Sequence, residues 1–440
     1  MDTPICDFVR RYSESGTLRL HMPGHKGVGP LGWERWDITE ISGADSLYEA
    51  DGIIAQSEAN ASWLFGCPTF YSTEGSSQCI RAMLHLATCG RSRKIAAGRN
   101  VHKTFLTAVA LLDLEVDWLY PQAEGAYLAC NLSAGELEAY FSGCEELPAA
   151  VYVTSPDYLG NMLPIDALAA VCHRYGVLLL VDNAHGAYLK FLPGGRHPMD
   201  QGADLCCDSA HKTLPVITGG AYLHIRDAAL AKQAKLALGL FGSTSPSYLI
   251  LQSLDAANAI LADRGYAADL VALSSRADAV RQALTERGIS ARNGDEPLKI
   301  TIYPRMYGYT GTEMADVLRQ NGMECEFADP DFLVLMLSPA IGQEDLQRLV
   351  RVLTALPRKP AIVSDVPVIP RAERVLSVRQ ALLAPSRQVP VCESLGKILA
   401  APSVGCPPAV PILVCGERID EDAIACFQYY GIESCTIVEE

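Results

Sequence analysis

The sequence predicts an α/β protein with a mainly parallel central sheet, followed by a smaller α+β unit and a C-terminal module. Between residues 46 and 254, apolar runs of strand length alternate with segments of helical periodicity, which is typical of a parallel sheet covered by helices. Prolines become frequent around residues 356–370 and indicate a linker. We therefore expect an N-terminal arm (1–45), a large domain (46–255), a small α+β domain (256–360) and a C-terminal module (361–440).

Each element follows from its local pattern. In the large domain, helical periodicity covers residues 52–64, 77–87, 102–112 and 166–175. Strand-like apolar runs lie at 94–97, 115–119, 149–154, 177–181, 203–207 and 221–225. In the small domain, helices are expected at 275–287, 313–320 and 345–353, and strands at 299–303, 324–327 and 332–337. Pro and Gly within residues 20–27 predict a tight turn in the arm.

Composition excludes several classes of protein. The 440 residues carry a formal net charge of −15, which argues against nucleic acid and anionic membrane as partners. No apolar run approaches the roughly 18 residues that span a bilayer, and the first residues do not resemble a signal peptide. The 15 cysteines form no CxxC pair. We therefore expect a cytoplasmic protein with reduced thiols and no metal site.

Two polar motifs follow strand-like runs about thirty residues apart. Asp182-Asn-Ala-His-Gly186 follows one run and Ser209-Ala-His-Lys-Thr213 follows the next. A carboxylate can keep a pyridine nitrogen protonated, while a lysine forms a Schiff base at the other end of the ring. Successive parallel strands bring both groups to one sheet edge. Taken singly, such an Asp is most often a turn residue and such a Lys is solvated, but together Asp182 and Lys212 predict a pyridoxal 5′-phosphate (PLP) site.

Beyond these motifs, the chain resembles the Orn/Lys/Arg decarboxylase family of PLP enzymes, which have the aspartate-aminotransferase fold (fold type I). The resemblance extends nearly end to end. It rests on residues 21–26, 37–43, 98–103, 182–186, 209–213 and 243–248, and on a closing Pro-Pro-x-x-Pro segment that leads to Gly416-Glu417. The layout is similar to that of the compact arginine or lysine decarboxylases, without the receiver-like N-terminal domain of the large forms.

The resemblance implies a set of cofactor-binding residues. Asp182 would pair with the pyridine nitrogen, Ala184 would let the ring approach, His185 would lie near the phenolic oxygen or the substrate carboxylate, and Lys212 would hold the cofactor. The PLP phosphate would be bound by Gly75, Ser76, Ser77, Ser209 and His211, at a helix start suited to anions. Without the resemblance, Gly75-Ser-Ser would be read as a loop and helix cap.

Two further predictions concern groups brought to the ring from elsewhere. His102 would stack on the pyridine face, although a helix cap or a core position are the ordinary alternatives. Ser243 and Thr244 would cross a dimer interface to the partner's phosphate, although a hydroxyl-rich N-cap explains them equally well. If the family arrangement holds, the active site needs two chains and a homodimer is the minimum unit.

The chain departs from the family pattern at five positions. These are Asp208 for Gln, Asn183 for Glu, Gly219 for Gln, Tyr48 for His and Glu74 for Asn. The cofactor residues are retained, so we expect the changes to act on the substrate pocket. An extra carboxylate at Asp208 or Glu74 would alter which side chain is accepted.

The implied reaction is the α-decarboxylation of a basic L-amino acid, with arginine favoured over lysine or ornithine. Asp45 and Glu417 are the candidate acids for the distal cation of the substrate, with ordinary surface carboxylates as the alternative reading. An aminotransferase, a β-eliminating lyase or a non-catalytic PLP-binding homologue on the same fold are competing hypotheses. The sequence does not distinguish whether the amine product serves polyamine synthesis or acid resistance.

Overall fold

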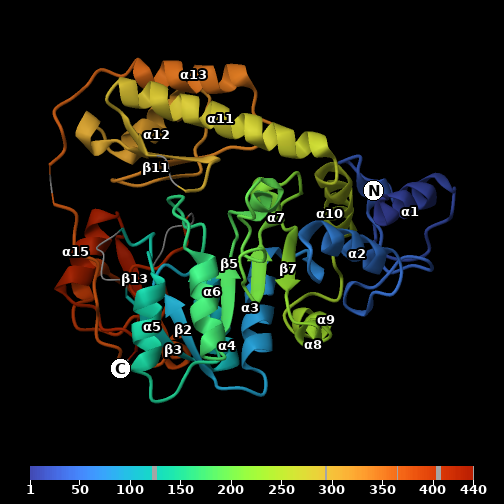
Figure 1. The fold of residues 1–440 in the computed structure, drawn as a ribbon, viewed down its shortest axis with the longest axis horizontal. Helices are drawn as coiled ribbons and strands as arrows, with labels where there is room; N and C mark the ends of the chain where they lie inside the picture. Colours follow the sequence, from blue (N-terminus) through green and yellow to red (C-terminus); the bar gives the residue numbers. More distant parts are fainter. Residues whose placement is uncertain (121–125, 293–294, 364, 403–407, 440) are drawn as a thin grey trace. The chain divides into compact units, whose positions relative to one another are not determined.

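The structure is a computed structural model that describes the whole chain except residues 121–125, 293–294, 364, 403–407 and 440. The described residues form two compact units (Figure 1). The first unit comprises residues 1–92, 141–155 and 164–268, and the second comprises residues 93–140, 156–163 and 269–440. The four-part division expected from the sequence stays a prediction.

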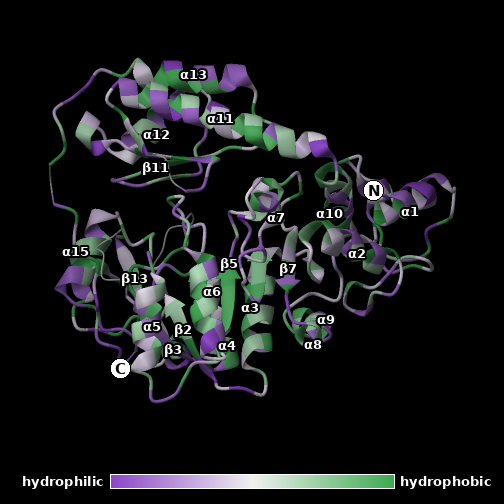
Figure 2. Ribbon diagram, in the orientation of Figure 1, coloured by the Kyte–Doolittle hydropathy of each residue, from purple (hydrophilic) through white to green (hydrophobic). Residues whose placement is uncertain are grey.

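The strands of the first unit lie in the order β1-β7-β6-β5-β4. Strands β4 (Ala150–Thr154), β5 (Leu178–Asp182) and β6 (Leu205–Asp208) are parallel, while β7 (Ala221–Ile225) runs antiparallel between β6 and β1 (Thr69–Ser72). These strands are almost entirely buried, and Figure 2 shows β5 as hydrophobic. The expected mainly parallel sheet is confirmed. Because β5 and β6 are parallel, the residues that follow them meet at one sheet edge.

The helices of the first unit pack on these strands, with α3 against β5, β6 and β7 and α6 against β5. The longer helices are α1 (Pro4–Glu14), α2 (Ile53–Phe65), α3 (Gly75–Thr88), α6 (Ile165–Arg174) and α10 (Tyr248–Leu261). The short helical segments are η1 (Glu34–Trp36), η2 (Leu47–Glu49), η3 (Ala187–Phe191), α7 (Ala210–Thr213), α8 (Ala228–Ala231) and α9 (Ala234–Gly239). The sequence patterns did not predict α1 or strand β1, whereas the helix expected after Pro246 is confirmed as α10.

The second unit holds three sets of paired strands. Strand β2 (Lys94–Gly98) is parallel to β3 (Glu115–Leu119). An antiparallel sheet has the order β10-β11-β9-β8, and its strands are β8 (Ser290–Arg292), β9 (Lys299–Tyr303), β10 (Phe327–Ala328) and β11 (Leu333–Met336). Strand β12 (Ser386–Pro390) pairs with β13 (Ser434–Val438). The strand expected at 324–327 is wrong in extent, because only Phe327 of those residues buries its side chain and pairs.

Helices cover the strands of the second unit as the α+β pattern predicts. They are α4 (Lys103–Leu112), α12 (Gly311–Gln320), α13 (Gln343–Thr354), α14 (Val378–Leu382) and α15 (Glu421–Tyr429), with short turns η4 (Arg305–Tyr307) and η5 (Val391–Glu393). Helices α5 (Ala134–Ser142) and α11 (Arg264–Glu286) carry the chain between units. In α13, Leu346, Leu349 and Leu353 are buried on one face, and Figure 2 shows the mixed hydropathy of this helix. Among the described helices, none has the length and apolarity needed to cross a membrane.

Candidate active site

Asp182 ends β5 as a buried carboxylate held by three donors. Tyr152 on β4 donates its hydroxyl to Oδ2 at 2.9 Å, and the backbone N–H of Ala184 donates to Oδ1 at 3.2 Å. The Cys207 thiol contacts the same Oδ1 at 3.6 Å. Burial raises the pKa of Asp182, while the Tyr152 hydrogen bond and the charge of Lys212 oppose that rise. The carboxylate is therefore fixed in orientation and lies within the electrostatic reach of Lys212.

Lys212 lies in α7, directly after β6. Its Nζ is 2.9 Å from Nε2 of His185, which follows β5. The side chain of Lys212 is exposed, whereas His185 is 5% exposed. The parallel strands thus bring the two sequence motifs into contact, as predicted, and the amine is accessible to a ligand.

Backbone and hydroxyl groups surround the start of α3. The Ser209 hydroxyl donates to the Ser76 hydroxyl at 2.8 Å, which joins the loop after β6 to the first turn of α3. Gly75 has a φ of 70°, a left-handed conformation that favours glycine, and its N–H donates to the Gly219 carbonyl at 2.7 Å. The free N–H groups of a helix start attract anions. Gly75, Ser76 and Ser209 therefore lie together at a helix start, and their expected binding of the phosphate stays a prediction.

His211 follows β6 and is hydrogen-bonded through one ring nitrogen. Its Nδ1 donates to the Gly220 carbonyl at 3.0 Å, so Nε2 is the acceptor nitrogen of the neutral ring. Burial lowers the pKa of His211, and the nearby charge of Lys212 also lowers it. Neutral His211 would offer a phosphate no proton from Nε2, so its expected phosphate contact stays a prediction.

Two of the five departures from the family pattern contact each other. The Asn183 amide donates to Oδ1 of Asp208 at 2.7 Å, and His197 and His224 both contact Oδ2, at 3.0 and 3.1 Å. All four side chains are fully buried. The expectation that Asp208 alters the substrate pocket is therefore wrong, because its carboxylate is enclosed by donors beneath the site.

Hydrogen-bond directions assign the charges of this cluster. The backbone N–H of Met199 donates to Nδ1 of His197, so the proton of His197 is on Nε2. Thr69 donates its hydroxyl to the Cys67 carbonyl and therefore accepts from Nδ1 of His224 at 2.9 Å, which leaves His224 protonated on both nitrogens. Burial opposes both shifts, yet the pKa of Asp208 is lowered and the pKa of His224 is raised, because carboxylate and imidazolium stabilise each other.

His197, Asp208 and His224 are also close enough together to hold a metal ion. The proton on Nε2 of His197, however, occupies the atom that would have to bind the metal. The hydrogen bonds account for the geometry of the cluster, and the sequence-based expectation of no metal stays a prediction.

Gly219, Tyr48 and Glu74 are the other departures. Gly219 has a φ of 102°, and a Cβ there would lie 3.0 Å from the Thr73 carbonyl oxygen, so the backbone requires glycine. The Tyr48 hydroxyl accepts from the Gln78 amide at 2.7 Å. Glu74 accepts from the backbone N–H of Ser243. None of these contacts identifies a substrate.

The two acids expected to bind the distal cation of the substrate have other partners. Asp45 accepts from the backbone N–H groups of Asp51, Gly52 and Ile54 at 2.8 to 3.1 Å, so it caps the start of α2. Glu417 is 3% exposed and pairs with Arg99 at 2.8 Å. These contacts correct the expectation for both residues, because each carboxylate is already committed within its own unit.

His102 and the 243–244 segment show their ordinary structural contacts. Nδ1 of His102 accepts from the backbone N–H of Thr104 at 3.2 Å and caps α4. Ser243 and Thr244 are exposed in the loop before α10. Stacking of His102 on a ring, and contact of the loop with a partner chain, stay predictions. The structure adds Tyr152 and Cys207 to the residues of the site, because both contact Asp182. In the sequence, each is marked only as a polar group within an otherwise apolar strand.

The fold, and the residues that lie together at the ends of β5 and β6, are those of an α/β enzyme of fold type I. A model of the Orn/Lys/Arg decarboxylase major domain matches residues 3–301. The chain therefore belongs to the Orn/Lys/Arg decarboxylase family.

Individual relatives agree with this assignment. The arginine decarboxylase of Bacillus subtilis (strain 168) is 28% identical, over 96% of this chain and 92% of its own. That of Halalkalibacterium halodurans is 29% identical over the same shares. The crystal structure of the Francisella novicida lysine decarboxylase matches with a TM-score of 0.80 and 18% identity, over 99% of this chain and 79% of the other. A variant of the serine palmitoyltransferase from S. paucimobilis with a bound PLP–myriocin aldimine matches with a TM-score of 0.55 and 14% identity, over 68% of this chain and 75% of the other.

Proposed function

We propose that this protein is a PLP-dependent decarboxylase that converts a basic L-amino acid to the corresponding amine and CO₂, with arginine as the favoured substrate. Membership of the decarboxylase family and the arginine decarboxylases among its relatives support the proposal. The observation that carries it is local: the buried Asp182 and the accessible Lys212 Nζ act on each other electrostatically at the ends of adjacent parallel strands.

The residues of the first unit fit the cofactor. Asp182 is a carboxylate held by donors, suited to a protonated pyridine nitrogen, and the start of α3 with Ser76 and Ser209 suits a phosphate. PLP, when bound, would supply an electron-withdrawing ring to accept the electrons released as CO₂ leaves. We therefore assign PLP to Asp182, Lys212, His185, Ala184, Gly75, Ser76, Ser77 and Ser209, with His102, His211, Ser243 and Thr244 as further proposed contacts.

Each side chain has a defined task in this proposal. Lys212 would hold the cofactor covalently through Nζ. His185, whose Nε2 is 2.9 Å from Lys212 Nζ, is placed to accept or return a proton at that nitrogen. Tyr152 and Cys207 keep their protons, because burial raises the pKa of both well above the usual range, and their hydrogens keep Asp182 in place.

We also propose that the protein is a cytoplasmic homodimer with the four-part domain division expected from its sequence. The first unit exposes large apolar side chains, some of which contact with a second copy would bury. They include Leu18, Leu20, Met22, Val28, Leu31, Trp33, Trp63, Leu236 and Leu240. A second copy would cover such a surface and could bring Ser243 and Thr244 to the partner's phosphate.

The proposal is tested on purified protein loaded with PLP. The expected result is a visible absorbance from lysine-bound cofactor, lost in Lys212→Ala, together with CO₂ release from arginine, lysine or ornithine measured in parallel. Absorbance without CO₂ from any of the three would overturn the decarboxylase assignment while leaving the cofactor site intact. Keto-acid or ammonia formation in the same reactions would then assign transamination or β-elimination.

A further inference from the structure

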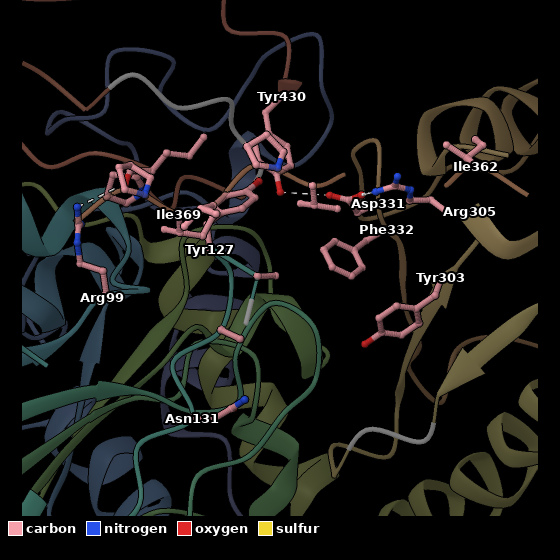
Figure 3. Close-up of a pocket in the computed structure, with 18 of the residues that line it drawn as sticks. Arg99, Tyr127, Asn131, Tyr303, Arg305, Asp331, Phe332, Ile362, Ile369 and Tyr430 are labelled. Atoms are coloured by element: carbon pink, nitrogen blue, oxygen red, sulfur yellow. Dashed lines mark hydrogen bonds and ion pairs between the residues drawn. The ribbon is translucent and has the colours of Figure 1, made fainter. Parts of the chain in front are cut away.

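The second unit encloses an arginine-lined cavity of about 960 Å³ whose charged groups are spread over its walls (Figure 3). Figure 3 shows Arg99 on one side of this cavity and Tyr303 on the other. Arg371 stacks on the ring of Tyr120, whose hydroxyl accepts from Arg99, while Arg292 stacks on the ring of Tyr303. Among the lining residues that the structure describes, the basic groups therefore lie on opposite walls.

The strand-end site, formed by the residues that follow β5 and β6, differs because its buried polar groups meet at one contact. The backbone pairing between the two strands ends at Asp182 and Cys207. The next backbone N–H, that of Asn183, donates to the Cys207 carbonyl at 3.0 Å. The Asn183 amide then donates to Oδ1 of Asp208 at 2.7 Å. A side-chain hydrogen bond thus continues the connection between the strands beyond their last paired residues.

The carboxylate of Asp208 is a fixed partner for this amide, because its other oxygen is held as well. His197 and His224 both donate to Oδ2, at 3.0 and 3.1 Å. Each histidine is in turn hydrogen-bonded through its Nδ1, and all four side chains of the cluster are fully buried. A carboxylate with donors on both oxygens cannot rotate without breaking several hydrogen bonds. Asp208 is therefore a rigid anchor for Asn183.

The same two chain segments are in contact at a second point. The backbone N–H of Gly186 donates to the Asn183 carbonyl at 2.9 Å, which closes a turn that carries His185. Nε2 of His185 lies 2.9 Å from Nζ of Lys212, four residues after Asp208. The hydrogen bond at the base of the two segments therefore restrains the contact at their reactive end.

The residue types at positions 183 and 208 agree with such a role. The family pattern has Glu at the first position and Gln at the second, whereas this chain has Asn183 and Asp208. The acid and the amide have exchanged places, so an amide can still face a carboxylate between the same two segments. The exchange also places a neutral side chain next to Asp182, where a second carboxylate would add repulsion.

We infer that Asn183 and Asp208 are positioning residues of the proposed cofactor site, and that their hydrogen bond determines where His185 meets Lys212. The inference rests on the PLP site proposed above, but not on which reaction that site catalyses. A protonated Nζ has only hydrogens to offer, so Nε2 of His185 is the acceptor of their contact. Loss of the bond at the base would release the turn, weaken this contact and make the proton on the lysine nitrogen easier to lose.

The test uses the PLP-loaded full-length protein without any amino acid. Asn183→Leu removes the donor with little change in volume. Asn258→Leu is the matched control, because Asn258 is equally buried in the same unit and donates to the Tyr71 hydroxyl at 2.7 Å. The amide oxygens of both asparagines also lack a hydrogen-bond partner. The double variant Asn183→Asp with Asp208→Asn restores an amide–carboxylate bond in the opposite direction and keeps an oxygen for the two histidines.

PLP affinity and the pH midpoint of the visible absorbance of lysine-bound cofactor are measured, with urea unfolding for stability. Asn183→Leu should weaken PLP binding roughly tenfold and lower the pH midpoint by about half a unit. Asn258→Leu should reduce the free energy of unfolding to a similar extent but leave both cofactor measurements unchanged. The double variant should recover most of the affinity and of the midpoint.

The inference is overturned if the two leucine variants affect the cofactor measurements alike. It is also overturned if the double variant folds but binds PLP no better than Asn183→Leu. Absence of PLP binding by the unsubstituted protein would instead overturn the proposed function, so the two failures are distinguishable.

Discussion

The strand-end site of the first unit and the arginine-lined cavity of the second differ in how the chain builds them. The strand-end site draws its main groups from two short motifs, residues 182–186 and 209–213, placed at adjacent ends of β5 and β6. The cavity draws its lining from segments spread between Arg99 and Tyr430. A site built from short motifs that follow neighbouring parallel strands can be recognised in the sequence. A cavity lined by loops that are far apart in the chain cannot.

The charged side chains of the two regions also differ in how deeply they are buried. At the strand ends, Asp182 and Asp208 are buried and held in place by donors, although burial raises the pKa of Asp182 whereas the two histidines lower that of Asp208. At the cavity, Arg292 and Arg371 are exposed and only stacked on rings. Substitutions should therefore cost activity or stability in the first region, whereas at the exposed Arg292 and Arg371 of the second they should cost little stability.

The largest expected effect is that of Lys212→Ala. Removing the amine that holds the cofactor should lower the rate of CO₂ release more than about a thousandfold, because the covalent route is lost. The free energy of unfolding should change little, since Lys212 is exposed. Lys232→Ala, at another exposed lysine of the same unit, serves as the control. A variant without Lys212 that retained the rate would move the chemistry away from the strand ends.

Asp182→Asn comes next. The amide keeps the shape of the side chain but loses the negative charge, so kcat should fall by about 10² to 10³ while KM for the amino acid changes little. Steady-state kinetics with the best substrate measure the two constants separately. Asp166→Asn, in the first turn of α6, is the matched control. Equal loss in both variants would mean that Asp182 acts through general stability.

Asp208→Asn tests the buried cluster beneath the site. Two histidines would face a neutral amide where a carboxylate now lies, so the free energy of unfolding should fall by about 3 kcal/mol. Urea unfolding at pH 7 measures the loss. Asp316→Asn, which breaks an exposed pair with Arg319, should cost far less, because solvent screens such a pair. Similar values for the two variants would show that the cluster does not stabilise the fold.

The same cluster predicts a pH dependence. The pKa of His224 is raised above 6.5, so its stabilising contribution is complete below that pH and is lost as the pH rises through the folded value. The pKa of Asp208 is lowered below 3.8, so its contribution is present above that pH and is lost only in strong acid. The stability difference between the unsubstituted protein and Asp208→Asn should therefore shrink as the pH rises from 6 towards 9. A constant difference would mean that His224 does not carry the charge.

These residues also show how far the sequence could predict the molecule. The parallel strands, Asp182, Lys212 and His185 follow from apolar runs and from the motifs after them. The roles of Asp45, Asp208 and Glu417 could not be predicted, because an acid reads alike whether it caps a helix, joins a buried cluster or binds substrate. Pairing of β12 with β13 was also hidden, since the two strands lie almost fifty residues apart in the chain.

The smallest of these effects is expected for Glu417→Gln, in the second unit, where Glu417 pairs with Arg99. Glu417 accepts from Arg99 at 2.8 Å and from the Val414 backbone N–H at 2.7 Å. The amide keeps an acceptor oxygen but removes the charge. Arg99 retains its contacts with Tyr120 and the Ile412 carbonyl. The free energy of unfolding should therefore fall by about 2 kcal/mol.

Urea unfolding of Glu417→Gln is compared with that of Glu373→Gln, which breaks an exposed pair with Arg418 and should cost less than about 1 kcal/mol. A loss of stability as small as that of the control would mean that the Glu417–Arg99 pair contributes no more than an exposed ion pair. A loss as large as that of Asp208→Asn would mean that the cavity wall is as firmly built as the strand-end site, and the contrast between the two regions would then rest on how the chain builds them.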